Sequence, residues 1–108
     1  MWTWSIAMPA VERVQYVDSL PSGYGRTLQD GTIELGPVCR ATPEIIQQCL
    51  IHEGMHLKGH GECLAYTAQL ILALEHHSED AIAWARELYW RYGEPACALN
   101  DAQGYDKY

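Results

Sequence analysis

The chain has 108 residues and a formal net charge of −7, from 14 acidic against 7 basic side chains. This length predicts one domain, 1–108, with a single modest core. Hydrophobic residues make up 48% and charged residues 19%, which is typical of a folded globular protein rather than a disordered one. Because lysine and arginine form no cluster, the acidic balance argues against nucleic acid as a partner.

The hydropathy of the chain argues against a membrane location. The longest strongly apolar stretch, 64–74, is interrupted by Tyr66, Thr67 and Gln69 and is shorter than a bilayer span. Residues 1–8 lack the basic leader and long apolar segment of a secretory signal. We therefore expect no membrane partner and, by default, a cytoplasmic protein.

The four cysteines leave the redox compartment open. Cys39, Cys49, Cys63 and Cys97 show no CxxC spacing, which disfavours a zinc ribbon. Their even number allows two disulfides in an oxidising compartment, whereas four reduced, buried thiols fit a reducing one equally well.

The first third of the chain predicts strands and turns. Residues 2–7 and 11–17 are rich in β-branched and aromatic side chains, and a turn-rich loop follows at 21–25. Residues 31–36 alternate apolar and polar side chains between two glycines. This alternation predicts a half-buried strand.

The pattern becomes helical from Thr42, an expected N-cap followed by proline at the first helical position. The apolar spacing predicts a first helix over about 43–58 and a largely buried second helix over about 62–77.

A third helix is expected to begin after Ser78 and to stop at Gly93, leaving an irregular polar tail after Pro95. The predicted fold class is α+β, a small N-terminal sheet packed on about three helices.

The segment His52-Glu53-Gly54-Met55-His56 carries the clearest chemistry. Residues four apart on a helix share a face and lie about 6 Å apart along the axis, so both imidazoles can face one ion. Glu53 lies about 100° around the helix, beside the ion, in the position of a general base. Zinc in such a site lowers the pKa of its water, and the carboxylate passes the proton of that water to the leaving amine.

A catalytic zinc needs a third protein ligand. Glu62 lies six residues after His56, with Gly59 between them. A continuous helix would carry residue 62 roughly 9 Å further along the axis, whereas a left-handed turn at Gly59 can fold the chain back. We favour Glu62 as the third ligand, with His60 as the alternative, because His60 would need the helix to continue or to unwind locally.

The extended pattern His-Glu-x-x-His-x-x-Gly-x-x-Glu resembles the zincin metallopeptidases, with the spacing of the metzincin clan. The likeness covers about a tenth of the chain and implies a zincin-like minimal catalytic core. It implies one zinc ion bound by His52, His56 and Glu62, with Glu53 as general base. The third ligand of that clan is usually His or Asp, and no methionine follows Met55 to supply its methionine turn. Such enzymes lay substrate along an edge strand, for which 32–35 is the expected segment.

Other roles compete for several of these residues. Cys49, His52, His56 and Cys63 could instead form a structural zinc site. Tyr66 can hydrogen-bond a substrate oxyanion, although core packing is the commoner role for a tyrosine on a buried helix.

His76 and His77 end the second predicted helix, where a cation suits the helix dipole. Their expected role is therefore capping.

The predicted activity is hydrolysis of a peptide or related amide in a protein or peptide substrate. The alternative is a non-catalytic interaction or assembly subunit, for example of a larger particle, that keeps a zincin scaffold with structural metal or none. Trp2, Trp4, Trp84 and Trp90, in a chain without phenylalanine, are mostly expected in the core, but some can form an aromatic surface for a protein partner.

Overall fold

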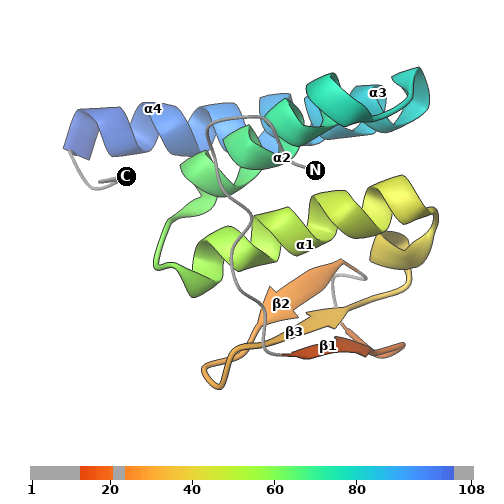
Figure 1. Cartoon of the computed structure of the whole chain (residues 1–108). Coiled ribbons are helices and arrows are strands. Elements are labelled where there is room, and N and C mark those ends of the chain that lie inside the picture. The colour runs from red at the N-terminus through yellow and green to blue at the C-terminus, as the bar shows by residue number, and fades with distance from the viewer. Residues whose placement is uncertain (1–12, 21–23, 104–108) are drawn as a thin grey trace.

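The structure, a computed structural model, describes residues 13–20 and 24–103, which form an α+β fold (Figure 1). A small sheet lies under one central helix, and the helices that follow this helix in the chain lie on its other side. The elements, in chain order, are β1 (Arg13–Tyr16), β2 (Gly25–Thr27), β3 (Thr32–Leu35), the 3₁₀ helix η1 (Val38–Arg40), α1 (Pro43–Leu57), α2 (Glu62–His76), α3 (Glu79–Leu88), the π-helical turn η2 (Tyr89–Gly93) and α4 (Glu94–Gln103). The predicted fold class is confirmed, and the strand expected at 2–7 lies outside the described residues.

The sheet has the order β1-β3-β2, with β3 parallel to β1 and antiparallel to β2. The prediction of a strand within 31–36 is confirmed, but its expected half-buried character and its expected place at the edge are both wrong. β3 is paired on both sides and all four of its residues are buried. The edge strand beside α1 is β2, whose three residues were too short a run to stand out in the sequence.

Helix α1 begins as its sequence predicts. The Thr42 hydroxyl accepts a hydrogen bond from the Ile45 amide at 3.1 Å, and Pro43 occupies the first helical position. The helix then buries two faces. One packs on the sheet through Ile45 and Cys49, and the other packs on α2 through Ile51 and Met55.

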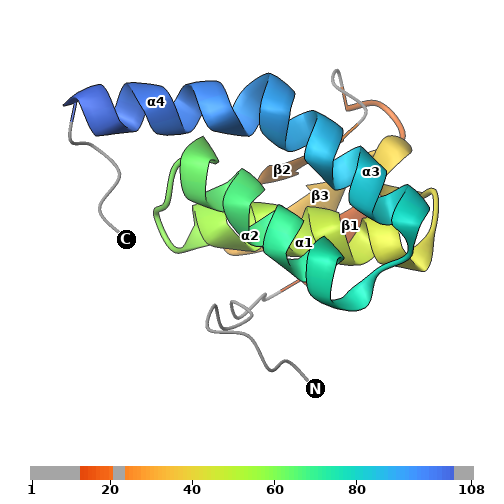
Figure 2. The same ribbon diagram turned by 90° about the horizontal axis from the view of Figure 1, so that it is seen from above.

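The helical region does not end at Gly93, and the expected irregular tail is helix α4. Figure 2 shows α3 and α4 following one another in a long helical segment above α2. In the wider turn η2, the Glu94 amide donates to the Tyr89 carbonyl, five residues back. A proline normally interrupts a regular helix, and here Pro95 is the second residue of α4, just after this widened turn.

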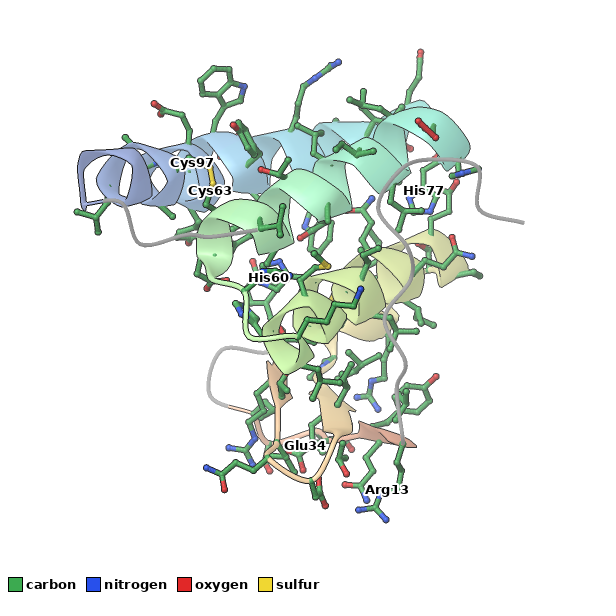
Figure 3. All side chains as sticks on the ribbon, turned by 60° about the vertical axis from the view of Figure 1, so that its left-hand side comes forward. Arg13, Glu34, His60, Cys63, His77 and Cys97 are labelled. Carbon is green, nitrogen blue, oxygen red and sulfur yellow. A yellow bond between two sulfur atoms is a disulfide. The ribbon has the colours of Figure 1, made fainter. Side chains whose placement is uncertain are left out.

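Two disulfides tie the elements together. Cys39 of η1 pairs with Cys49 of α1, and Cys63 of α2 pairs with Cys97 of α4 (Figure 3). The structural zinc site that would use Cys49 and Cys63 is therefore excluded, because both sulfur atoms are in covalent bonds with other cysteines. Among the described residues, no helix is both long enough and apolar enough to cross a bilayer.

Gly93 allows the close approach of η2 to α2. A methyl group at Gly93 would lie 2.7 Å from Cβ of Tyr66 and 2.9 Å from the Tyr89 ring. We expect Gly93→Ala to lower the free energy of unfolding in urea. The overpacking penalty of about 1–3 kcal/mol exceeds the roughly 0.5–1 kcal/mol that alanine gains over glycine in a helix. The control is Glu94→Ala at the exposed neighbouring position, with a change within about 0.5 kcal/mol. An alanine variant as stable as the parent would contradict this role.

Candidate metal centre

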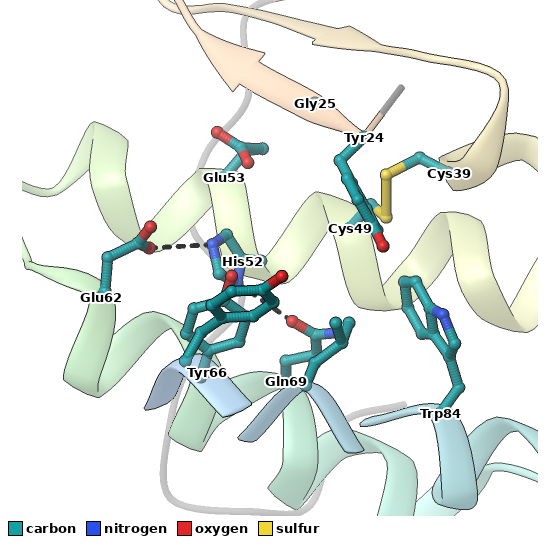
Figure 4. Close-up of a pocket in the computed structure, with 12 residues that line it drawn as sticks. Tyr24, Gly25, Cys39, Cys49, His52, Glu53, Glu62, Tyr66, Gln69 and Trp84 are labelled. Atoms are coloured by element: carbon teal, nitrogen blue, oxygen red, sulfur yellow. Dashed lines mark hydrogen bonds and ion pairs between the residues drawn. A yellow bond between two sulfur atoms is a disulfide. The ribbon is translucent and has the colours of Figure 1, made fainter. Parts of the chain in front are cut away.

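Three side chains meet at the junction of α1 and α2. Both histidine Nε2 atoms face the same carboxylate oxygen, Oε1 of Glu62, at 3.1 Å from His52 and 2.7 Å from His56. The candidate ligand atoms all lie within 4.8 Å of one another, and this is the group among the described residues that can hold a metal ion. Figure 4 shows Glu62 reaching toward His52 from the other helix. The three ligands expected from the sequence are therefore brought together.

The turn after α1 brings Glu62 back to the histidines, as its glycine predicts. Gly59 has a φ of +87°, in the left-handed region. Its amide donates to the His56 carbonyl at 2.9 Å, and the His60 amide donates to the Met55 carbonyl at 3.1 Å. These two bonds form the Schellman motif that ends a helix and satisfies its last carbonyls.

His60 takes a different part in the site. Its backbone carbonyl accepts a hydrogen bond from Nδ1 of His56 at 2.9 Å, and its side chain is not a member of the ligand group. The structure thus favours Glu62 over His60 as the third ligand, although His60 still orients a ligand through its main chain.

The donor set fits a cation. His52 directs Nδ1 at the Gln69 side-chain oxygen at 3.0 Å, and His56 directs Nδ1 at a carbonyl. Oxygen atoms of these kinds only accept, so each neutral ring carries its proton on Nδ1 and presents the Nε2 lone pair. Two lone pairs and a carboxylate oxygen then point at one another, and only a positive charge satisfies all three.

The pKa values of His56 and Glu62 are shifted in the directions that place a positive charge among the three side chains. The hydrogen bond with Glu62 raises the pKa of His56 to about 8, and burial opposes the shift. The hydrogen bonds that the His52 and His56 rings donate when protonated hold the pKa of Glu62 far below its ordinary value. A proton on His56 can therefore supply the positive charge when no metal does.

Glu53 lies beside the ligands and is not one of them. Its carboxylate accepts a hydrogen bond from the Thr27 hydroxyl of β2 at 2.9 Å. A Cβ at Gly25 would lie 3.5 Å from Cγ of Glu53, in ordinary van der Waals contact, so β2 passes directly beside this side chain. Figure 4 places Glu53 between His52 and Gly25. The carboxylate is buried and held by the edge strand, a contact that no sequence spacing indicated.

A pocket of about 380 Å³ adjoins the ligand group. Its polar end carries Glu53 and two of the three candidate ligands, His52 and Glu62, and its far end is aromatic and apolar. The lining residues are Tyr24, Gly25, Cys39, Cys49, His52, Glu53, Glu62, Tyr66, Gln69, Trp84, Leu88 and Tyr92.

Tyr66 both packs and lines this pocket. Its ring meets the His52 ring edge to face, with centroids 4.3 Å apart. Burial, followed by the charge of Glu62, raises the pKa of the Tyr66 hydroxyl well above its usual value. The hydroxyl therefore stays protonated and can donate a hydrogen bond.

Comparison of the chain with protein-family models, curated proteins and solved structures finds no match. The chemical argument therefore depends on the site itself.

The stability of the metal-free protein should depend on pH through His56. Because its pKa in the folded state, about 8, exceeds the ordinary 6.5, the His56–Glu62 pair stabilises the fold fully below pH 6.5 and progressively less up to about 8. We expect the melting temperature to fall across this interval, as measured by circular dichroism with a chelator present. In Glu62→Gln this fall should be reduced, and a full-sized fall in that variant would contradict the assignment.

Alanine variants of Glu62 and His60 should show which of the two residues is the third ligand. We expect Glu62→Ala to weaken metal binding more than about 100-fold, beyond the usual loss for a supporting residue. His60→Ala keeps the backbone carbonyl that orients His56, so its affinity should stay close to that of the parent. Isothermal titration of both variants with zinc tests this, and the reverse order would make His60 the ligand.

Proposed function

We propose that this protein is a small zinc-dependent hydrolase of the zincin type, acting on a peptide or related amide. The observation that carries the proposal is the position of Glu53, buried on the pocket wall beside three converging ligand atoms. Two imidazole nitrogens and one carboxylate oxygen, with an open fourth position, are a donor set typical of catalytic zinc. Zinc bound there supplies a Lewis acid and lowers the pKa of a coordinated water.

The residues of the chain would share the remaining work. Glu53 accepts a proton from the attacking water and passes it to the leaving amine. The Thr27 hydroxyl holds the Glu53 carboxylate at the edge of the sheet. Protonated Tyr66 is a donor available to the developing oxyanion, from a position against the His52 ring.

The substrate would lie between the edge strand and the pocket. β2 pairs with β3 on one side, and among the described strands it has no neighbour on the other. An extended peptide can pair with such an edge through its main chain. The apolar end of the pocket, where Tyr24 stacks on Trp84 with centroids 6.3 Å apart, would receive an apolar side chain.

The decisive experiment is Glu53→Gln, which keeps the shape of the side chain and an acceptor for Thr27. We expect the variant to bind zinc as the parent does and to hydrolyse unstructured fluorogenic peptides about 10²- to 10⁴-fold more slowly. The matched control is Glu79→Gln at an exposed glutamate, with parental turnover. A parent that binds no zinc, or a Glu53→Gln protein of undiminished activity, would refute the proposal.

A non-catalytic scaffold or assembly subunit is the second candidate. The supporting observation is Trp90 on η2, a large aromatic residue that is 63% exposed and of a type enriched at protein interfaces. Stoichiometric zinc in a parent protein that hydrolyses no peptide would favour this function over the first.

A further inference from the structure

Two glutamines lie in the core behind the metal centre. Gln48 of α1 is 0% exposed and Gln69 of α2 is 2% exposed. A buried amide destabilises the fold unless its polar atoms are hydrogen-bonded. Here every nitrogen and oxygen of the two amide groups has a partner.

The Ala81 carbonyl fixes which atom donates and which accepts in each hydrogen bond from Gln48 to His52. The Ala81 carbonyl can only accept, so the Gln48 atom 3.0 Å from it is the amide nitrogen. The Gln48 oxygen then faces Gln69 and accepts from its nitrogen at 3.0 Å. This leaves the Gln69 oxygen facing Nδ1 of His52 at 3.0 Å. Each amide thus passes the direction of the hydrogen bond to the next group.

The same chain has a second branch at the surface. The Gln48 nitrogen also lies 3.2 Å from Nδ1 of His77, which accepts, and Nε2 of His77 donates to the exposed Gln47 at 2.7 Å. Burial lowers the pKa of His77, with the nearby Glu44 opposing the shift. Because Nδ1 accepts in this arrangement, the His77 ring is a neutral acceptor. His77 is the C-cap residue of α2, as predicted, and it caps through its backbone amide, which donates to the Ala73 carbonyl at 3.0 Å.

We propose that Gln48 and Gln69 are positioning residues that hold His52 with its proton on Nδ1 and its Nε2 lone pair toward the metal. Without the two glutamines, the His52 proton can instead lie on Nε2, where it forms a hydrogen bond to the Glu62 carboxylate 3.1 Å away. That tautomer must be reversed before a metal ion binds. The inference rests on the proposed function, because it concerns the same metal site, and it adds two residues that are not members of the ligand group.

The stability of the fold does not by itself require the side-chain amides of Gln48 and Gln69. Replacing both partners of a buried hydrogen bond by apolar groups of similar shape is often nearly neutral for stability. Losing the group that orients a metal-bound histidine usually weakens metal binding about 10- to 100-fold. Stability and metal affinity should therefore respond differently to changes in this pair.

The first test uses the metal-free parent protein. Above pH 8, where the pKa of His56 leaves that ring neutral, nitrogen-15 spectra of the histidine rings should show His52 protonated at Nδ1. Finding the proton at Nε2 would overturn the proposal. This measurement needs no metal, so it tests the positioning role independently of zinc binding. A parent protein that fails to bind zinc would refute the proposed function, and the spectrum would still show whether His52 is protonated at Nδ1.

The second test compares variants. In Gln48→Met with Gln69→Met, we expect a cooperatively folded protein whose zinc affinity falls about 10- to 100-fold and whose His52 shifts toward the Nε2 tautomer. Gln15→Met, at an exposed position of β1 far from this chain of hydrogen bonds, should change neither property. A double variant with parental affinity and the Nδ1 tautomer would overturn the proposal.

The third test uses Gln69→Glu. The new carboxylate still accepts from Nδ1 of His52, so zinc affinity should stay within about tenfold of the parent. Its second oxygen faces the Gln48 oxygen, so the melting temperature should fall. If Gln48 and Gln69 only stabilise the fold, zinc affinity should fall with melting temperature in every variant. That result would overturn the proposal. This variant and the parent spectrum remain decisive if the double variant does not fold.

Discussion

The left-handed turn at Gly59 is the constraint on which the site depends. Two helices joined by only the four residues 58–61 must reverse direction within one turn. For an L-residue this conformation costs roughly 1–2 kcal/mol, which glycine avoids. The Schellman bonds of the turn also aim the His60 carbonyl at His56. One local feature therefore ends α1, returns Glu62 to the histidines and orients one of them.

The same reversal lays α2 along α1 and so sets what lies behind the ligands. Tyr66 and Gln69, one and two turns after Glu62, meet the His52 ring at its face and at Nδ1. Gly93 lets η2 approach Tyr66 from the far side. The ligands thus rest on packed side chains of the neighbouring helix rather than on a loop, which favours a precise geometry.

Charge links this geometry to stability. Three acceptors directed at one point repel one another unless a cation lies among them, so metal and proton compete for the same place. The pKa of His56 is raised and the pKa of Glu62 is lowered because a positive charge is favoured among these acceptors. A metal ion bound at this centre would therefore displace a proton near neutral pH.

The sequence by itself determined the local features. Helix α1, its cap at Thr42, the shared face of the histidines and the turn at Gly59 all follow from spacing and from the preferences of single residues. The return of Glu62 to the two histidines followed from the same turn geometry. These predictions hold because each depends on bonds within about one or two turns of chain.

Only the tertiary structure decided the long-range pairings. The partners of the cysteines, the central place of β3 and the contact of Thr27 with Glu53 join residues that are distant in sequence. The helix beyond Gly93 was missed because glycine and proline usually end a helix, whereas here the widened turn η2 and the contact with Tyr66 outweigh that preference. Gln48 and Gln69 read as ordinary polar residues until the packing of three helices buries them. Local propensity describes single elements, and the site also depends on how those elements pack.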